Sequence, residues 1–240
     1  LAFSVYAKKR GHNVTLFDKA GEIGGQFNFA KQVPGKEEFY ETIRYFRQQL
    51  HKHNIEVRLN SEQTVESLVD GNFDEIVLAT GIVPRKLELE GIESDKVMTY
   101  LDVLRDKKPV GDKVAIIGAG GIGFDVACYL VEKESLATKP QQWMQNWGVD
   151  VGFSEGGALL QKAGEATPSR EIHLLQRKTT KVGAGLGKTT GWIHRKTLQK
   201  HGVNMIKGAG YNKITDQGLV ITLDGEEKEL AVDNVIICAG

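Results

Sequence analysis

The sequence predicts an α/β fold of three layers, built from two similar units of alternating strands and helices. Three observations lead to this prediction. A glycine-rich turn at residues 118–123 stands between an apolar strand and an apolar helix. Residues 1–18 give a helix and then a short strand that ends in an acid. Two apolar strands that end in small residues, 75–81 and 234–240, repeat one pattern near the end of each unit. Together they predict two Rossmann-like dinucleotide-binding domains.

Composition and charge narrow the class of protein. Of the 240 residues, 40% are hydrophobic and 26% are charged, as in an ordinary globular protein. The 31 basic side chains balance 31 acidic ones, so neither a nucleic acid nor an anionic membrane is an expected partner. No apolar run approaches the roughly 18–20 residues that span a bilayer. We therefore expect small-molecule ligands.

The two cysteines, Cys128 and Cys238, lie far apart in the sequence and form no CxxC motif. Without that motif, neither a thioredoxin-type redox centre nor a cysteine-ligated iron–sulfur cluster is expected in this chain. We expect both side chains to be small apolar fillers and predict no metal site. This cysteine usage fits a reducing cytoplasm.

The first predicted domain covers residues 1–97. A helix over 1–11 ends at Gly11, and a buried strand over 14–18 ends in Asp18. After the first glycine loop of a dinucleotide-binding unit, this order places a carboxylate at the hydroxyl pair of a ribose. Because that glycine loop would precede Leu1, we expect a truncated first domain in a piece of a longer protein.

The remainder of the first domain alternates helix and strand. Residues 36–54 form an amphipathic helix whose apolar side chains recur at helical spacing and therefore belong to the core: Phe39, Ile43, Phe46 and Leu50. A half-buried strand covers 55–59. The buried strand 75–81 ends in small residues, which let a ligand or backbone come close. Pro84 then begins a connecting segment that runs to about Pro109.

Each glycine in the turn of the second predicted domain has a specific structural role. Gly118 permits a tight turn, and Gly120 lets the backbone approach a pyrophosphate. Gly123 lets the helix pack closely against the strand, and the helix N-terminus, with Gly121 and Ile122, faces the anion. The alternative of a glycine-rich turn without a ligand is less consistent with the strand before it and the helix after it.

The second predicted domain covers 98–235 and contains a long excursion. Its glycine-turn helix spans about 122–133, and the next strand, 170–177, follows only after an insertion at 134–169. That stretch is too long for a simple connection, which favours a functional or docking segment. A surface subdomain with its own small tryptophan core remains an equal alternative.

The residues at the end of the predicted strand 170–177 favour the binding of a ribose that carries a 2′-phosphate. Gln176, Arg177 and Lys178 stand where the first domain has Asp18. A carboxylate would repel a 2′-phosphate, whereas arginine and lysine bind it. We therefore predict NADPH rather than NADH. The alternative is that the two bases sit on a solvated turn.

The stretch 185–195 contains Gly-Lys-Thr but is no P-loop, because the required upstream glycine falls on Val182 and no strand leads into it. We expect a loop that enters a helix, where Lys188 and Thr189 can face a phosphate. Alternating strands follow over 203–230.

These residues resemble the two-dinucleotide-domain flavoproteins of the glutathione-reductase type, and more narrowly the bacterial NADPH-dependent 2,4-dienoyl-CoA reductases. The resemblance covers essentially the whole chain. It rests on six strings: Gly24–Phe27, Pro34–Tyr40, Thr80–Arg85, Tyr100–Arg105, Gly118–Asp125 and Gly185–Arg195. The last string is the most specific, and the glycine motifs are shared widely.

The resemblance implies that this chain is the FAD- and NADPH-binding part of such an enzyme. In that family an N-terminal TIM barrel holds FMN and the dienoyl-CoA site, and a 4Fe–4S cluster lies next to it. NADPH gives a hydride to FAD, electrons pass singly through the cluster to FMN, and FMN reduces the dienoyl thioester in the β-oxidation of unsaturated fatty acids. The barrel, FMN, the cluster and the catalytic acids lie outside this chain. We therefore assign no catalytic residue, and we expect the fragment alone to be inactive.

The resemblance also implies cofactor-binding residues. Asp18 matches the acid at the FAD ribose, Gly25 and Gln26 match the loop along FAD, and Lys36 lies in the next string. The remaining assigned positions are Gly118, Gly120, Gly121, Ile122, Gly123, Gln176, Arg177, Lys178 and Gly240. Residues 236–240 and residues beyond both ends are expected to complete the FAD domain, so the chain alone should bind FAD weakly or not at all.

A second interpretation belongs to another class. Trimethylamine-dehydrogenase-like flavoproteins share this architecture and hold ADP structurally, and a structural ADP needs no partner for a 2′-phosphate. Arg177 and Lys178 discriminate between the two. A thioredoxin-reductase-like enzyme is disfavoured because it would need the missing CxxC. The sequence leaves open the acyl-chain preference, the oligomeric state and the role of 134–169.

Overall fold

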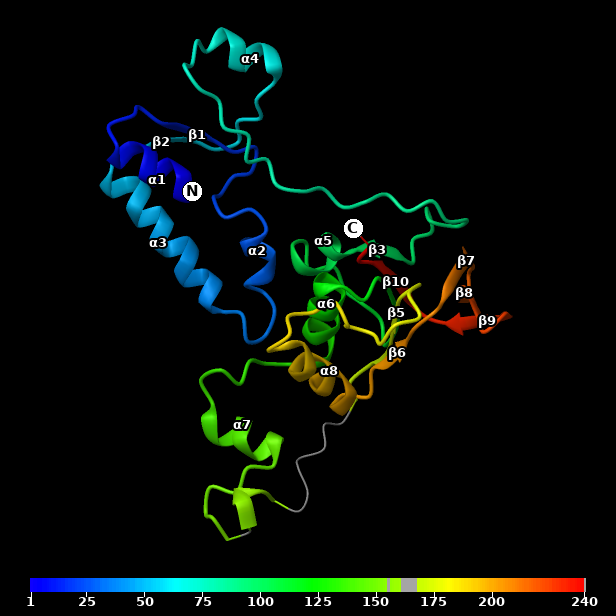
Figure 1. Ribbon diagram of the computed structural model, residues 1–240. Helices are drawn as coiled ribbons and strands as arrows, with labels where there is room; N and C mark the ends of the chain where they lie inside the picture. The colour runs from blue at the N-terminus through cyan, green and yellow to red at the C-terminus, as the bar shows by residue number, and fades with distance from the viewer. Residues whose placement is uncertain (155, 161–167, 240) are drawn as a thin grey trace. The chain divides into compact units, whose positions relative to one another are not determined.

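The computed structural model describes residues 1–154, 156–160 and 168–239 (Figure 1). The chain divides into two compact units, one of residues 1–31 and 36–83, the other of 32–35 and 84–240. The short stretch 32–35 groups with the second unit, where the Gly35 amide donates to the Ser135 hydroxyl at 3.3 Å. The boundary at 83/84 lies earlier than the predicted one at 97/98.

The first unit is a small α/β arrangement. Its elements are α1 (Ala2–Lys9), β1 (Thr15–Phe17), α2 (Phe27–Ala30), α3 (Glu38–Lys52), β2 (Glu56–Arg58) and α4 (Val65–Asp70). Strands β1 and β2 pair in parallel with Leu16 opposite Val57. Side chains of α1 and α3 pack with residues near the strands to form its core: Val5, Ile23, Ile43, Leu50 and Ile55. The amphipathic helix predicted over 36–54 is confirmed.

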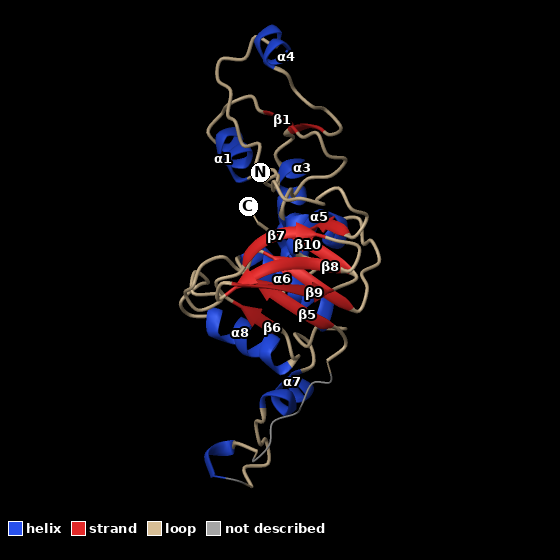
Figure 2. Ribbon diagram, turned by 90° about the vertical axis from the view of Figure 1, so that its right-hand side faces the viewer, coloured by secondary structure: helices blue, strands red, loops and turns tan. Residues whose placement is uncertain are grey.

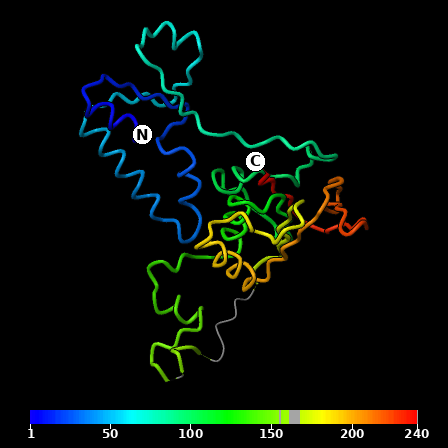
Figure 3. The backbone as a smooth tube through the Cα atoms, viewed as in Figure 1, coloured from blue at the N-terminus to red at the C-terminus, as the bar shows by residue number. Residues whose placement is uncertain are grey.

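The strand predicted over 75–81 is wrong. Every residue from 71 to 83 is exposed, including Leu78 at 76%, and within the described residues no strand pairs with this stretch. Figure 3 traces the backbone through it. A strand is stabilised by hydrogen bonds and side-chain contacts with a neighbour, so an apolar composition without a neighbour does not produce one. For the same reason β1, expected to be buried, is only half-buried in a sheet of two strands.

The second unit contains a five-stranded parallel sheet in the order β3-β10-β4-β5-β6. A separate antiparallel sheet has the order β7-β8-β9. The strands are β3 (Val97–Thr99), β4 (Lys113–Ile117), β5 (Glu171–Leu175), β6 (Asn204–Ile206), β7 (Gly210–Ile214), β8 (Gly218–Leu223), β9 (Glu226–Ala231) and β10 (Asn234–Ile237). The helices are α5 (Tyr100–Leu104), α6 (Gly121–Val131), α7 (Pro140–Trp147) and α8 (Gly191–Lys200).

Three layers form this unit, as predicted. The smaller sheet covers one face of the parallel sheet in Figure 2, and α5, α6 and α8 lie on the other side. Strand β4 explains why both faces of the parallel sheet are covered, because its residues from Val114 to Ile117 are all fully buried. Ala115 and Ile117 pack against the smaller sheet, where they meet Leu219 and Ile221. A strand that is apolar on both faces needs a cover on both sides.

Two assignments differ from the prediction. The segment expected to connect the domains, from Pro84 to about Pro109, contains β3 and α5, and β3 forms an edge of the parallel sheet. Residues 236 and 237, expected to complete the first domain, lie in β10 and pair with both β3 and β4. Two parallel neighbours hold β10 in the second unit, and Gly240 lies outside the described residues.

Helix α7 occupies the long insertion, and none of its residues is buried. The rings of Trp143 and Trp147 have centroids 6.0 Å apart, and Trp143 is 48% exposed. From α8, the Lys200 ammonium donates to the backbone oxygen of Asn146 and lies 5.1 Å from the centre of the Trp147 ring. In the part of the insertion that the structure describes, Trp143 therefore fills no core. Residues 155 and 161–167 lie outside that part.

No helix in the described residues is both long and apolar enough to cross a membrane.

Candidate functional site

The glycine turn lies at the topological switch point of the parallel sheet, where the order in which strands are added reverses. The sheet extends from β4 through β5 to β6 on one side and through β10 to β3 on the other. Ile117 at the end of β4 is in register with Leu175 of β5 and Ile237 of β10. The Gly118 amide donates to the Leu175 oxygen at 3.0 Å, and the Cys238 amide donates to the Ile117 oxygen at 2.8 Å. In open α/β sheets, nucleotides bind at this point, outside the carboxyl ends of the strands.

Two glycines of the turn are required by packing within the chain. Gly118 has a φ of +109°, and a Cβ there would lie 2.8 Å from the carbonyl oxygen of Cys238. A Cβ on Gly123 would lie 1.8 Å from the Gly118 oxygen. The close approach of helix and strand that the sequence predicted for Gly123 is therefore present in the structure.

The other two glycines are not required by the chain. A Cβ on Gly120 or on Gly121 would meet no atom within 4 Å. The Gly120 backbone, with a φ of −85° and a ψ of −169°, is one that any residue adopts. The open space lies at the N-terminus of α6, whose first amide groups, including that of Ile122, donate no hydrogen bond to a capping side chain. Such amides bind phosphate, so these residues fit a pyrophosphate.

A polar turn of residues 176–180 follows β5, next to the glycine turn at the end of β4. The Gln176 side-chain amide donates to the backbone oxygens of Lys178 at 2.9 Å and Thr180 at 2.7 Å. The Gly208 amide donates to the same Lys178 oxygen at 3.0 Å. The Arg177 and Lys178 side chains are exposed. The structure thus brings the residues 176–178 to the same sheet edge as the glycine turn, because β4 and β5 are neighbours in register.

Tyr211 is a neighbour of this turn that the sequence did not indicate. It lies half-buried in β7, and burial raises its pKa to about 12, although the positive charge of Arg177 acts in the opposite direction. Tyr211 is therefore a neutral phenol near the guanidinium at neutral pH. The alternating pattern over 203–230 predicts a strand but gives no signal for this neighbour.

The segment from Gly183 to Arg195 leads into α8, which contacts α6. A Cβ on Gly183 would be 2.7 Å from the Phe124 ring, and Arg195 from α8 donates to the Gly183 oxygen at 3.1 Å. Lys188 and Thr189 are exposed in the loop before α8. The helix expected after this loop is confirmed as α8, which begins at Gly191.

Both cysteines are buried, as expected of small apolar fillers, and they form no disulfide with each other. Burial, reinforced by the Asp125 carboxylate, raises the pKa of the Cys238 thiol. The thiol therefore stays protonated and is a poor nucleophile. Among the described residues, no group of three or more histidine, cysteine, aspartate or glutamate side chains could hold a metal ion.

The residues assigned to FAD lie in the first unit. Asp18 directly follows β1, and its carboxylate accepts a hydrogen bond from the Ala20 amide at 2.9 Å. Gly25 has a φ of +51° and open space beside it, and Gln26 follows it at the N-cap of α2. Lys36 lies two residues before α3. The open space at Gly25 leaves room for a ligand at the start of α2.

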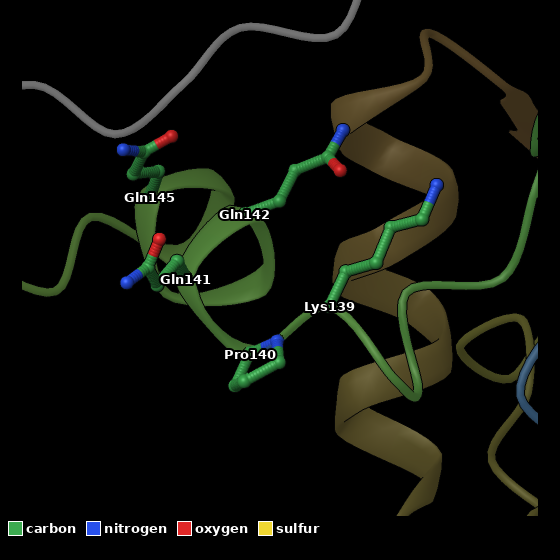
Figure 4. Close-up of a pocket in the computed structure, with 5 residues that line it drawn as sticks. All are labelled: Lys139, Pro140, Gln141, Gln142 and Gln145. Carbon is green, nitrogen blue, oxygen red and sulfur yellow. The ribbon is translucent and has the colours of Figure 1, made fainter.

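An open hollow beside α7 is separate from these residues. It is lined by Lys139, Pro140, Gln141, Gln142 and Gln145 (Figure 4). This lining offers no carboxylate, thiol, hydroxyl or imidazole, and its one charged group, the Lys139 ammonium, donates to the Glu134 carboxylate.

Fold and glycine turn together define a nucleotide-binding domain of an oxidoreductase. The chain belongs to the pyridine nucleotide-disulphide oxidoreductase family, whose model matches residues 1–240. This membership makes it a flavin-dependent pyridine nucleotide oxidoreductase domain and implies FAD and NAD(P) as cofactors. Its two buried cysteines form no CxxC motif, so it has the nucleotide-binding architecture of the family without a disulphide centre of that type.

Relatives include reductases and amine dehydrogenases. A cinnamate reductase of Clostridium sporogenes is 31% identical over 96% of this chain and 30% of its own length. An N,N-dimethylglycine/sarcosine dehydrogenase of Chromohalobacter salexigens is 25% identical over 96% of this chain and 30% of its own. A 2-naphthoyl-CoA reductase in complex with 2-naphthoyl-CoA is 26% identical, with a TM-score of 0.77 over 99% of this chain and 31% of that one. The chain therefore spans about a third of the length of such proteins.

Proposed function

We propose that this chain is the FAD- and NADPH-binding part of a 2,4-dienoyl-CoA reductase. In this proposal the first unit holds FAD through Asp18, Gly25, Gln26 and Lys36. The second unit holds NADPH at the glycine turn and the polar turn after β5. When bound, the two cofactors supply hydride transfer from the nicotinamide to the flavin. The residues of this chain bind and orient them, and a barrel domain of the same parent protein would take the electrons onward.

One observation carries the choice of NADPH. Arg177 and Lys178 are both exposed at the carboxyl end of β5, next to the glycine turn at the end of β4. An acid at this place accepts hydrogen bonds from the ribose hydroxyls of NADH, but it would repel a 2′-phosphate. Arginine and lysine form charge-assisted hydrogen bonds with phosphate oxygens.

The dienoyl-CoA substrate is supported by the resemblance over Gly185–Arg195 and by the relatives. Two relatives are named cinnamate reductase and 2-naphthoyl-CoA reductase, after an unsaturated carboxylate and the thioester of an aromatic acid. A dienoyl thioester is a compound of the same kind.

A specific observation favours a second candidate. The similarity to a dimethylglycine/sarcosine dehydrogenase over 96% of the chain is compatible with a structural ADP module of a trimethylamine-dehydrogenase-like flavoprotein. Such a module would have no need for cations at the position of a 2′-phosphate. The two candidates therefore differ in the ligand that the turn after β5 selects.

Calorimetric titration of the chain with NADPH, NADH and ADP tests the proposal. Replacing both Arg177 and Lys178 by alanine should weaken NADPH binding by about 2–4 kcal/mol and change NADH binding little. The control is the double alanine variant of Lys133 and Lys228, two exposed lysines of the second unit that lie outside this turn. If NADPH, NADH and ADP bind equally, and the Arg177 and Lys178 variant binds them as the natural chain does, the ADP module is the better account.

A further inference from the structure

The turn after β5 contains one polar side chain that points into its own backbone. Gln176 donates from its side-chain nitrogen to the oxygens of Lys178 and Thr180, at 2.9 and 2.7 Å. A neutral side-chain amide has two N–H groups, so it can donate one to each of these two oxygens. Because these groups are used inside the turn, Gln176 is better placed to shape the turn than to contact a ligand.

The backbone of Gln176 is fixed on the opposite side by the connection between β6 and β7. Its amide donates to the Ile206 oxygen at 3.0 Å, and its oxygen accepts from the Ala209 amide at 3.0 Å. The Gly208 amide donates to the Lys178 oxygen at 3.0 Å, so that oxygen accepts two hydrogen bonds. Strand β5 and the connection after β6 therefore provide a rigid base for the turn.

The side chain of Gln176 reaches across the turn from residue 176 to the backbone oxygen of Thr180. Residues 177 to 180 are exposed, and exposed turns of this length sample several conformations unless hydrogen bonds restrict them. The two bonds from Gln176 restrict the segment that carries both cationic side chains. Holding them in one arrangement lowers the entropy that a phosphate must overcome on binding.

We infer that Gln176 is a positioning residue for recognition of the 2′-phosphate, and that it selects NADPH through the turn rather than by touching the cofactor. This inference rests on the proposed function, since it requires Arg177 and Lys178 to bind that phosphate. Gln176 has a second effect at the same position. A carboxylate there could not donate to the two backbone oxygens and would repel them, so a glutamate would disrupt the turn as well as repel the phosphate.

The test compares Gln176→Met, Gln176→Glu and Gln176→Asn in calorimetric titrations of the full 240-residue chain with NADPH and NADH. Methionine keeps the length of the side chain but has no donor, so NADPH affinity should fall about tenfold. NADH affinity should stay within about twofold, because NADH has no phosphate at this position. Glutamate should lower NADPH affinity further. Asparagine, which is shorter by one methylene and cannot reach both oxygens, should fall between methionine and the natural chain.

NADH serves as the internal reference for folding, because a damaged domain would lose both nucleotides together. The control variant is Gln217→Met, which makes the same chemical change at an exposed position between β7 and β8. A selective loss of NADPH in Gln176→Met, absent in Gln217→Met, supports the positioning role. An equal loss of both nucleotides, or an unchanged NADPH to NADH ratio in all three Gln176 variants, overturns it while the proposed function stands. A natural chain without any preference for NADPH overturns both.

Discussion

We expect that substitutions can separate the glycines of the turn that the fold requires from those that the proposed nucleotide requires. The perturbations are Gly123→Ala and Gly120→Ala, one methyl group each, three residues apart. At Gly123 the new Cβ would lie 1.8 Å from the Gly118 oxygen, whereas at Gly120 it would meet nothing within 4 Å. We expect Gly123→Ala to lower the stability of the second unit, and Gly120→Ala to lower only the affinity for the nucleotide.

The size of the first effect follows from the geometry. An ordinary contact needs at least 3.4 Å, so the start of α6 must withdraw from β4 by about 1.6 Å (3.4 minus 1.8). Overpacking of this kind costs about 3 kcal/mol, and the better helix propensity of alanine returns about 1 kcal/mol. The net loss of about 2 kcal/mol corresponds to a fall in Tm of about 4–8 °C in a domain of this size.

Thermal unfolding followed by circular dichroism, without nucleotide, measures the stability of both variants. Gly120→Ala should unfold within about 1 °C of the natural chain, since its backbone angles suit alanine. In calorimetry its added methyl group should weaken NADPH binding at least about tenfold, because the phosphate must approach the backbone there. The reasoning would be refuted if Gly120→Ala bound NADPH as the natural chain does, or if Gly123→Ala were as stable as the natural chain.

Two further predictions concern the stability of the second unit. Burial pushes the pKa of Asp102 upward, but hydrogen bonds from Lys108 and Thr99 outweigh it and hold the pKa at about 2. Because the pKa of Asp102 is lowered in the folded chain, its contribution to the free energy of unfolding is present above about pH 4 and is lost as the pH falls toward 2. Asp102→Asn should therefore lower the free energy of unfolding by about 1–2 kcal/mol at pH 7. Urea unfolding at pH 2 should find little difference between this variant and the natural chain. Leu174 of β5 is fully buried, so Leu174→Ala should cost about 3–5 kcal/mol and lower the urea midpoint, whereas Leu159→Ala at a 61% exposed position should change it little.

Local patterns predicted much of the second unit because its elements are specified by neighbours in sequence. The order of strand, glycine turn and helix at 113–131 depends on side-chain period and on glycine, both of which are visible in the sequence. The turn between β8 and β9 likewise consists of two residues adjacent in sequence, Asp224 and Gly225. Both have a positive φ, at +52° and +86°, as the turn between two antiparallel strands requires.

Pairing between distant segments could not be read in this way. The strings at 75–81 and 234–240 look alike in sequence. Residues 234–237 of the second string form a strand, because β10 has β3 and β4 as neighbours. The short strand β3 was missed for the opposite reason. Its three residues have no period to detect, and their conformation depends on a partner 138 positions later, with Val97 opposite Val235.

The sequence predicted which types of residue stand at the candidate site, but not how they shape the backbone around it. Asp18 and Gln176 each follow a strand of a dinucleotide unit, and the sequence contrasts them by charge. In the structure they also differ in how they organise the turn that follows. Asp18 accepts from an amide two residues later, whereas Gln176 donates to oxygens two and four residues later. The residue at this position therefore affects the path of the backbone as well as the local charge.

This coupling has a consequence for changing cofactor preference. If charge alone selected the cofactor, removing Arg177 and Lys178 would be enough to make NADH the better ligand. Because the turn is held by the donors of Gln176, an acid introduced at 176 would at the same time release the oxygens of Lys178 and Thr180 from their hydrogen bonds. If the chain prefers NADPH as proposed, a conversion to NADH requires a turn with a different backbone path, in which the acid accepts from an amide as Asp18 does. Exchanging the complete segment 176–180 should succeed where single substitutions only weaken NADPH binding.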